Sequence, residues 1–222
     1  MRVSHCLLGR LPGTVLRQWL PHIQERALTK GQRLQSQGSI AHEFQVIKLG
    51  FVLAMRQGDD GVARPVALLG NGHALGSPGW LQQPSAMHFE ALGHGRICSV
   101  DIATITRKGL VDAGFIRALA IHYTQHNAML AEWARIARVP GVLRQLAATL
   151  LQLSRLQTSL LVRLPSQGAL AALLATRRET IARGLHRLAR LQALERVDRW
   201  HCTLCPKVLH SISEEHMAQE TV

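Results

Sequence analysis

Residues 166–188 carry the pattern that most constrains the fold, because they predict two short helices joined by a tight turn. Ser166 and Thr176 both favour the N-cap of a helix, since each hydroxyl can accept a backbone N–H of the first turn. Glu179 follows Thr176 by three residues and completes a capping box, which predicts where the second helix begins. Apolar residues at helical spacing predict one buried stripe on that helix: Ile181, Leu185 and Leu188.

The opposite face of the second helix is polar. At about 100° per residue, one line along the helix collects four polar side chains, with Arg178 at the helix tip: Glu179, Arg183, His186 and Arg190. A helix pair that exposes carboxylate and guanidinium groups from the second helix has the layout of a DNA-reading helix-turn-helix.

Positive charge is concentrated around this segment. Residues 135–207 carry thirteen Lys and Arg against three Asp and Glu, a balance of +10. Residues 1–134 have a balance of only +5, and residues 208–222 have −3. A solvated basic surface or attraction to anionic lipid would also explain such charge. Because the charge coincides with the helix-turn-helix pattern, binding to the phosphate backbone of DNA is favoured.

The run Arg178-Glu179-Thr180-Ile181-Ala182-Arg183 resembles the recognition helix of the cyclic-AMP receptor protein/fumarate-nitrate regulator (CRP/FNR) family of bacterial transcription factors. The resemblance implies an α+β fold of about this length. It would comprise an N-terminal double-stranded β-roll like that of cyclic-nucleotide-binding domains, a long dimerisation helix and a C-terminal winged helix-turn-helix.

The rest of the chain offers these parts in the same order. We expect a sensor domain at residues 1–107, beginning with a helical lead-in over residues 1–30. Short β-branched runs separated by Gly and Asp clusters predict an antiparallel roll or barrel: residues 44–49, 51–55, 66–69 and 96–100. The DNA-binding domain is expected at residues 140–222, with a helix at 142–157 and the wing at 195–204.

A long helix is expected at residues 108–139, ended by Pro140-Gly141, which marks a hinge. Its apolar residues keep close to a seven-residue repeat, interrupted by His126 or Asn127: Ile116, Leu119, Tyr123, Leu130, Trp133 and Ala137. Such a seam can pair two helices, although an amphipathic helix more often packs on its own domain. Next to a helix-turn-helix, a homodimer is favoured, since two-fold proteins read palindromic DNA.

The recognition helix suggests which groups read bases. Arg178 and Arg183 can donate to guanine O6 and N7, and Glu179 can accept from cytosine N4. The resemblance implies a palindromic site with TGTGA-like half-sites. Four further residues are expected to hold phosphates and set the register: Ser166, Thr176, Arg177 and Arg187.

The resemblance also places an effector pocket in the sensor domain, at Gly76, Ser77, Met87 and His88. Ser77 stands where cyclic-nucleotide members have a ribose-binding Glu, and Met87-His88 stands where they have a phosphate-binding Arg-Ser pair. Without that guanidinium, no obvious group at these positions neutralises a cyclic phosphate. Cyclic AMP is therefore not expected to be the effector.

Other cofactors remain open. Cys6 and Cys98 are too few for an iron–sulfur cluster held by four thiolates. Four residues have the ligand types of a zinc site: His201, Cys202, Cys205 and His210. On the strand expected there, residues three apart point to opposite faces, which favours two buried or half-buried cysteines instead.

Haem is a second open alternative, because some members of the family sense gases through haem. The candidate ligands are scattered histidines together with Cys6: His88, His94, His122 and His126. Surface exposure or a hydrogen-bonded place in the core is the more common fate of such histidines.

The sequence shows no paired catalytic carboxylates, phosphate-cradling loop or nucleophile arrangement, so an enzyme is not expected. It has neither an apolar run long enough to span a bilayer nor a signal-peptide pattern, and a cytoplasmic location is expected. Expected partners are double-stranded DNA and a second copy, with RNA polymerase as a candidate. The alternatives are a small-molecule-, haem- or metal-binding β-roll whose basic C-terminal region binds nucleic acid non-specifically, and a membrane-surface adaptor.

Overall fold

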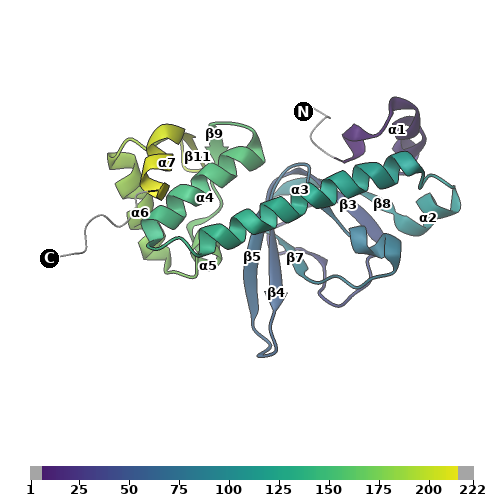
Figure 1. Ribbon diagram of the computed structural model, residues 1–222, viewed down its shortest axis with the longest axis horizontal. Coiled ribbons are helices and arrows are strands. Elements are labelled where there is room, and N and C mark those ends of the chain that lie inside the picture. Colours follow the sequence, from purple (N-terminus) through teal and green to yellow (C-terminus); the bar gives the residue numbers. More distant parts are fainter. Residues whose placement is uncertain (1–6, 215–222) are drawn as a thin grey trace. The chain divides into compact units, whose positions relative to one another are not determined.

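The computed structural model describes residues 7–214, and the chain divides into two compact units (Figure 1). Unit 1 is Met1–Ala131 and unit 2 is Glu132–Val222. Within residues 7–214, no helix is both long and apolar enough to cross a membrane.

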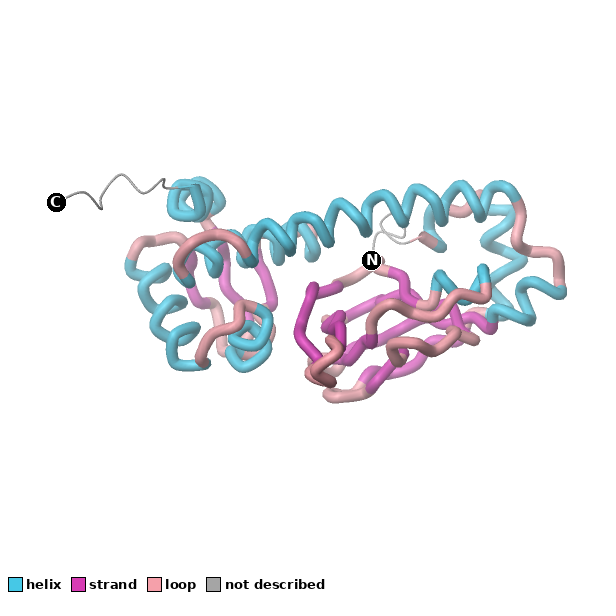
Figure 2. The backbone as a smooth tube through the Cα atoms, turned by 60° about the horizontal axis from the view of Figure 1, so that its bottom comes forward, coloured by secondary structure: helices cyan, strands magenta, loops and turns pink. Residues whose placement is uncertain are grey.

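Unit 1 contains two four-stranded sheets in which every neighbouring pair of strands is antiparallel. Figure 2 draws the strands in magenta. The first sheet has the order β1 (Gln24–Leu28), β8 (Gly95–Asp101), β3 (Glu43–Leu49), β6 (Ala74–Leu75). The second has the order β2 (Arg33–Gln35), β7 (His88–Ala91), β4 (Val52–Gln57), β5 (Ala63–Leu69). The expectation of an antiparallel roll is confirmed, and each of the four runs expected to be strands overlaps a strand.

The helical lead-in is shorter than expected. It comprises the 3-10 turn η2 (Leu8–Arg10), α1 (Gly13–Trp19) and the 3-10 turn η3 (Leu20–His22). Residues 24–28 are not helical but form β1, which pairs with β8 from Gln24 opposite Ser99 to Leu28 opposite Gly95. The expectation of a helix to residue 30 was wrong because a distant strand supplies backbone hydrogen bonds to this segment.

An aromatic cluster joins the helices of unit 1 to its first sheet. Trp19 and Phe115 lie with ring centroids 4.8 Å apart, and Trp80 of the 3-10 turn η4 (Ser77–Leu81) lies 5.2 Å from Phe115. Phe44 of β3 completes the cluster, 6.0 Å from Trp80. The indole N–H of the fully buried Trp19 donates to the carbonyl of Leu110 at 3.2 Å, so its polar group is satisfied.

The long helix α3 (Ala113–Ala137) begins later than expected. It follows α2 (Ile102–Arg107) and a turn in which Gly109 adopts a φ of +66°. Asp112 caps its first turn, since its Oδ1 accepts the Phe115 N–H at 2.7 Å.

The structure buries some residues of the expected apolar seam of α3 and exposes others. Leu119 and Trp133 are buried, so they do not belong to an exposed seam. Ile116 and Tyr123, by contrast, are 49% and 36% exposed. Within unit 1, the exposed residues that share one line along α3 are Ile116, Ala120, Tyr123 and Asn127.

Unit 2 is a helical unit with a three-stranded antiparallel sheet of order β10–β11–β9. Its elements are α4 (Val142–Gln157), β9 (Leu161–Arg163), α5 (Gln167–Leu173), α6 (Arg178–Arg190), β10 (Leu194–Arg196), β11 (His201–Leu204) and α7 (Pro206–Glu214). The expected helix at 142–157 is confirmed. The β10–β11 hairpin lies where the wing was expected.

Close packing of α6 on α4 fixes the core of unit 2. Leu146, Leu150 and Leu153 of α4 are fully buried. A Cβ at Gly184 of α6 would lie 2.9 Å from Leu146 Cδ2, so the absence of a side chain there allows the two helices to approach.

Candidate nucleic-acid interface

The helix-turn-helix is formed by α5 and α6, and the sequence predicted one of its two caps correctly. Ser166 caps α5, because its Oγ accepts the Ala169 N–H at 3.2 Å. The predicted capping box at Thr176 was wrong: α6 begins at Arg178 with Arg177 at the N-cap. Thr176 belongs to the preceding turn, where Ala175 has a φ of +49° and the Thr176 N–H donates to the Ala171 carbonyl at 2.9 Å.

This correction changes the chemistry of the helix tip. Among the described residues, no side chain caps the first turn of α6. Backbone N–H groups at a helix N-terminus that no side chain satisfies are donors for water or for an anion, and the helix dipole favours negative charge there. The exposed Arg177 and Arg178 add two guanidinium groups at the same tip.

The division of α6 into a buried and an exposed face is confirmed. Ile181, Leu185 and Leu188 are at most 2% exposed and pack into unit 2. The exposed side chains are Arg178, Glu179, Arg183, His186, Arg187 and Arg190. By helical geometry, Glu179 and Arg183 share one line and Arg187 lies beside it, whereas Arg178 stands at the helix tip.

The wing presents a second group of exposed residues that sequence reasoning missed. At the turn between β10 and β11, the guanidinium of Arg199 lies 4.9 Å from the ring centroid of Trp200, which is 45% exposed. Asp198 shapes this turn, because its Oδ1 accepts the N–H groups of Trp200 and His201 at 2.6 and 2.7 Å. These hydrogen bonds, that of Trp200 first, lower the pKa of Asp198. These exposed residues could have been predicted from the sequence, because Arg199 stands beside an aromatic residue in the turn of the hairpin.

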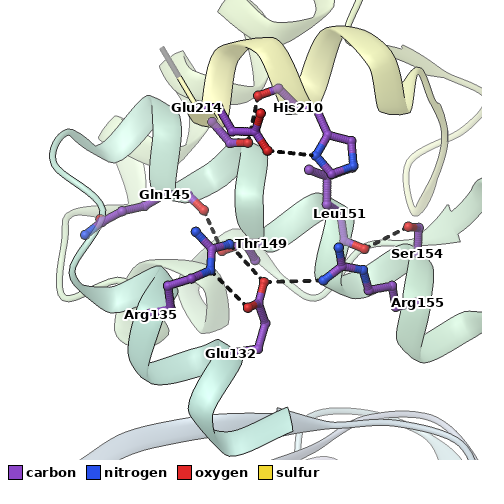
Figure 3. A network of polar contacts seen from close by, with 10 residues as sticks. Glu132, Arg135, Gln145, Thr149, Leu151, Ser154, Arg155, His210 and Glu214 are labelled. Carbon is purple, nitrogen blue, oxygen red and sulfur yellow. Dashed lines mark hydrogen bonds and ion pairs between the residues drawn. The ribbon is translucent and has the colours of Figure 1, made fainter. Parts of the chain in front are cut away.

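A polar network ties the end of α3 to α4 within unit 2 (Figure 3). Glu132 accepts from Arg135 Nε and Nη2 at 3.0 and 2.9 Å and from Arg155 Nη1 at 3.3 Å. The hydrogen bond from Arg135 is the largest cause of a lowered pKa at Glu132. Trp133 and Ile136 on the same stretch are buried, and the ion pairs of Glu132 join this end of α3 to α4.

The zinc candidates of unit 2 have other partners. His201 Nδ1 lies 2.8 Å from the carboxylate of Asp198, and His210 Nδ1 of α7 lies 3.6 Å from that of Glu214. Cys202 is fully buried on β11, and burial raises its pKa to about 11, which favours the thiol over the metal-binding thiolate. Within residues 7–214, no group of three or more His, Cys, Asp or Glu is arranged to hold a metal ion.

The residues expected to line an effector pocket are largely occupied by packing. Gly76 has a φ of +81°, and a Cβ there would lie 2.1 Å from the carbonyl oxygen of Glu43. Ser77 is buried at the start of η4. Met87 is half-buried, and His88 is buried as the first residue of β7.

Two of the proposed haem ligands meet a histidine that sequence reasoning missed. The rings of His73, His122 and His126 lie with centroids 6.2–6.5 Å apart. His122 Nε2 accepts the Ala74 N–H at 3.2 Å. Burial lowers the pKa of His73, and burial together with the neighbouring His73 lowers that of His126 to about 4.

His73 and His126 therefore favour the neutral form at pH 7. No sequence spacing pointed to His73, which reaches α3 only through the connection between β5 and β6. The other proposed ligands do not join the cluster: His88 is buried on β7, His94 is exposed, and Cys6 lies outside the described residues.

The sequence matches no protein-family model and no curated protein. Solved structures do resemble it. FixK2 from Bradyrhizobium japonicum superposes with a TM-score of 0.73 at 18% identity, covering 87% of this chain and 98% of FixK2. A transcriptional regulator of the CRP/FNR family from Thermus thermophilus gives a TM-score of 0.63 at 20% identity, covering 86% of this chain and 99% of that chain.

A third structure, the c-di-GMP responsive global regulator CLP from Xanthomonas campestris, gives a TM-score of 0.64 at 17% identity. It covers 87% of this chain and 99% of CLP. The chain thus has the fold of CRP/FNR-type transcriptional regulators over most of its length.

Proposed function

We propose that this chain is a homodimeric, sequence-specific DNA-binding regulator of transcription. The observation that carries the proposal is the exposed face of α6, where Arg178, Glu179 and Arg183 project from a helix whose first turn has no side-chain cap. The fold shared with CRP/FNR-type regulators supports the same function.

In this proposal, α6 lies in the major groove and its N-terminal half reads bases. Arg178 and Arg183 each donate two hydrogen bonds to a guanine, and Glu179 accepts one from a cytosine amino group. The target is a palindrome with TGTGA-like half-sites, as the resemblance of residues 178–183 implies.

Phosphate contacts fix the register of α6 on the DNA. The backbone N–H groups at its first turn and the guanidinium groups of Arg177 and Arg187 bind phosphate oxygens. Ser166 accepts the Ala169 N–H through its oxygen, so its hydroxyl proton remains to be donated. Thr176 contributes its hydroxyl from the turn, instead of capping α6.

The line of Ile116, Ala120, Tyr123 and Asn127 on α3 is the surface on which a second copy pairs. It combines two exposed large side chains with a small residue that allows close approach and a polar residue that can fix the register. A two-fold dimer presents two copies of α6 to the two halves of a palindrome.

Cyclic AMP does not control this protein in our proposal. Ser77, Met87 and His88 replace the family's ribose- and phosphate-binding residues, and none of them supplies a guanidinium. Gly76 packs against the backbone of Glu43, which explains why a glycine stands at this position without a bound nucleotide.

Fluorescence anisotropy with labelled duplexes tests the proposal. At about 150 mM salt we expect a TGTGA-type palindrome to bind about 10³-fold or more tightly than a scrambled duplex. Equal affinity for the two duplexes would overturn sequence-specific binding. It would favour a basic region that binds nucleic acid non-specifically.

Two comparisons sharpen this measurement. Arg183→Ala should reduce the preference for the palindrome, whereas Arg64→Ala, at an exposed arginine of unit 1 that pairs with Asp60, should leave it unchanged. Micromolar cyclic AMP should not change the affinity, and a several-fold increase would contradict the assignment of the sensor unit.

A further inference from the structure

Three imidazoles meet where α3 lies against the connection between β5 and β6, residues 70–73. His73 comes from this connection, and His122 and His126 stand one turn apart on α3. The ring centroid of His73 lies 6.5 Å from that of His122 and 6.3 Å from that of His126, and the two rings on α3 are 6.2 Å apart. His122 is buried, and the other two residues are half-buried. We call this group the histidine cluster.

The hydrogen bond of His122 requires a neutral ring. Its Nε2 accepts the N–H of Ala74, the first residue of β6, at 3.2 Å. A ring nitrogen accepts only through a free lone pair, whereas in a protonated imidazole both nitrogens carry hydrogen and donate. A proton on Nε2 would therefore set two N–H groups against each other and break this bond between α3 and β6.

A positive charge on His73 or His126 would have no counter-ion, because neither ring forms an ion pair among residues 7–214. His73 Nδ1 lies 3.0 Å from the carbonyl oxygen of Gly70, and the buried Nδ1 of His126 has no hydrogen-bond partner in the same part of the chain. Two positive rings at this distance repel each other, and burial adds the cost of removing charge from water. Burial is accordingly the first cause of the lowered pKa of both residues.

The described elements around the cluster supply no compensating acid. Residues 70–72 and the two residues of β6 are not titratable, and between residues 113 and 131 the one charged side chain of α3 is the cation of Arg117. The charged residues of β3, the strand that pairs with β6, are held by other strands: Glu43 by Arg26 and Lys48 by Glu25. A metal ion does not fill this role, since no group of three such ligands is arranged to hold one within the described residues.

The cluster lies on the same turns of α3 as the proposed pairing surface. His122 and His126 directly precede Tyr123 and Asn127, which belong to the line of exposed residues on which a second copy pairs. Because α3 is one continuous helix, a displacement of its inner side moves its outer side as well. Packed interfaces adopt discrete arrangements and do not deform continuously, so such a displacement disturbs pairing.

We propose that the histidine cluster is an acid-sensitive switch that controls the pairing of two copies. With neutral rings, α3 is held on β6 by the bond from Ala74 to His122, and the pairing surface is in place. Protonation separates this part of α3 from residues 70–74 and weakens the dimer. The acid-driven opening of the cluster stands on its own, whereas its effect on pairing rests on the proposed function.

Sedimentation velocity on the full chain at pH 7.5 and pH 5.5 tests the switch. We expect the dissociation constant of the wild-type dimer to be about threefold or more higher at pH 5.5, since each proton taken up on opening shifts the equilibrium by up to about tenfold per pH unit. His126→Gln should remove most of this difference, and His94→Gln, at an exposed turn, should retain it. DNA is omitted, because protonation of the exposed His186 on α6 would add a phosphate contact.

Hydrogen exchange of the Ala74 amide, measured by NMR and corrected for the intrinsic rate at each pH, tests the opening itself. Its protection should decrease about threefold or more from pH 7.5 to pH 5.5 in the wild type. In His122→Gln, the side-chain carbonyl oxygen can accept the same N–H and does not titrate, so protection should change much less.

Two results would overturn the proposal: a dissociation constant and an Ala74 protection that do not change with pH in the wild type, or changes that persist in full in the glutamine variants. Circular dichroism checks folding, and His73→Gln replaces either variant that does not fold. If the chain does not dimerise at pH 7.5, the proposed function loses its dimer, and Ala74 protection still decides whether acid opens the cluster.

Discussion

The two units of this chain differ in where their notable polar groups lie, on the surface in unit 2 and in the interior in unit 1. In unit 2, the groups assigned to function lie on the surface, where arginines line α6 and the wing while the core beneath is apolar. In unit 1, the unusual polar groups are partly or fully enclosed. The ring centroids of His73 and His126 lie 6.3 Å apart, and the buried Gln45 has no partner among the described residues for one amide atom. Surface groups that meet a polyanion need only a helix to hold them, whereas buried polar groups depend on the packing of several elements.

We expect the largest effects from truncating one core side chain in each unit. Leu185→Ala in α6 and Leu68→Ala in β5 each remove a side chain that is at most 2% exposed, and each should cost about 2–5 kcal/mol of folding stability. Calorimetric unfolding combined with DNA-binding titrations checks this. Leu185→Ala should abolish DNA binding at temperatures where unit 1 stays folded, and equal destabilisation of both units by either change would show one cooperative unit.

Acid should affect unit 1 through its histidines. His126 has a pKa of about 4 in the folded protein, against an ordinary value of 6.5. Between these values the unfolded chain binds a proton that the folded unit does not, so stability should decrease as the pH falls from 6.5 to 4. The loss should reach roughly 1–3 kcal/mol.

Denaturant unfolding of unit 1 at pH 7 and pH 5 measures this loss. His126→Gln should reduce the difference between the two pH values, and His94→Gln, at an exposed turn, should retain it. An unchanged difference in His126→Gln would contradict a neutral His126 in the folded state.

Arginines at different positions on α6 should separate base reading from phosphate binding. Arg178→Ala should cost about 1–3 kcal/mol of binding and relax the preference at one base pair. Arg187→Ala should weaken binding to every sequence about equally and reduce the salt slope by about 1. Binding titrations against single-base variants of the palindrome distinguish the two patterns, and a uniform loss in both variants would make Arg178 a phosphate contact.

The smallest expected effect concerns the caps of the two helices. Ser166→Ala removes the observed hydrogen bond to the Ala169 N–H and should cost about 1 kcal/mol of unfolding free energy in unit 2. Thr176→Ala should cost less, because Thr176 does not cap α6. Urea unfolding monitored by circular dichroism compares them, and a larger loss for Thr176→Ala would restore the capping box.

Much of unit 2 could be predicted because its decisive patterns are local. Helical periodicity correctly placed Ile181, Leu185 and Leu188 inside and the charged residues of α6 outside, and Ser166 was correctly identified as a cap. The start of α6 was missed because Ala175 has a positive φ, which places Thr176 in the turn. An alanine in the sequence gives no sign of such a backbone conformation.

Unit 1 was predicted only in outline. Alternating and β-branched runs correctly indicated an antiparallel roll, but β1 was assigned to a helix because its pairing with β8 joins residues far apart in the chain. On α3, the seven-residue repeat identified apolar positions without showing that Leu119 and Trp133 are buried whereas Ile116 and Tyr123 are exposed.

The sequence by itself therefore determined the class of fold, the position of the helix-turn-helix and the side chains that its second helix exposes. These follow from periodicity and charge within one segment. Only the tertiary structure decided that His73 meets His126, that His122 accepts the Ala74 N–H, and that Gly76 packs on Glu43. The physical reason is that burial and hydrogen-bond partners are set by how distant strands and helices pack, which no local spacing encodes.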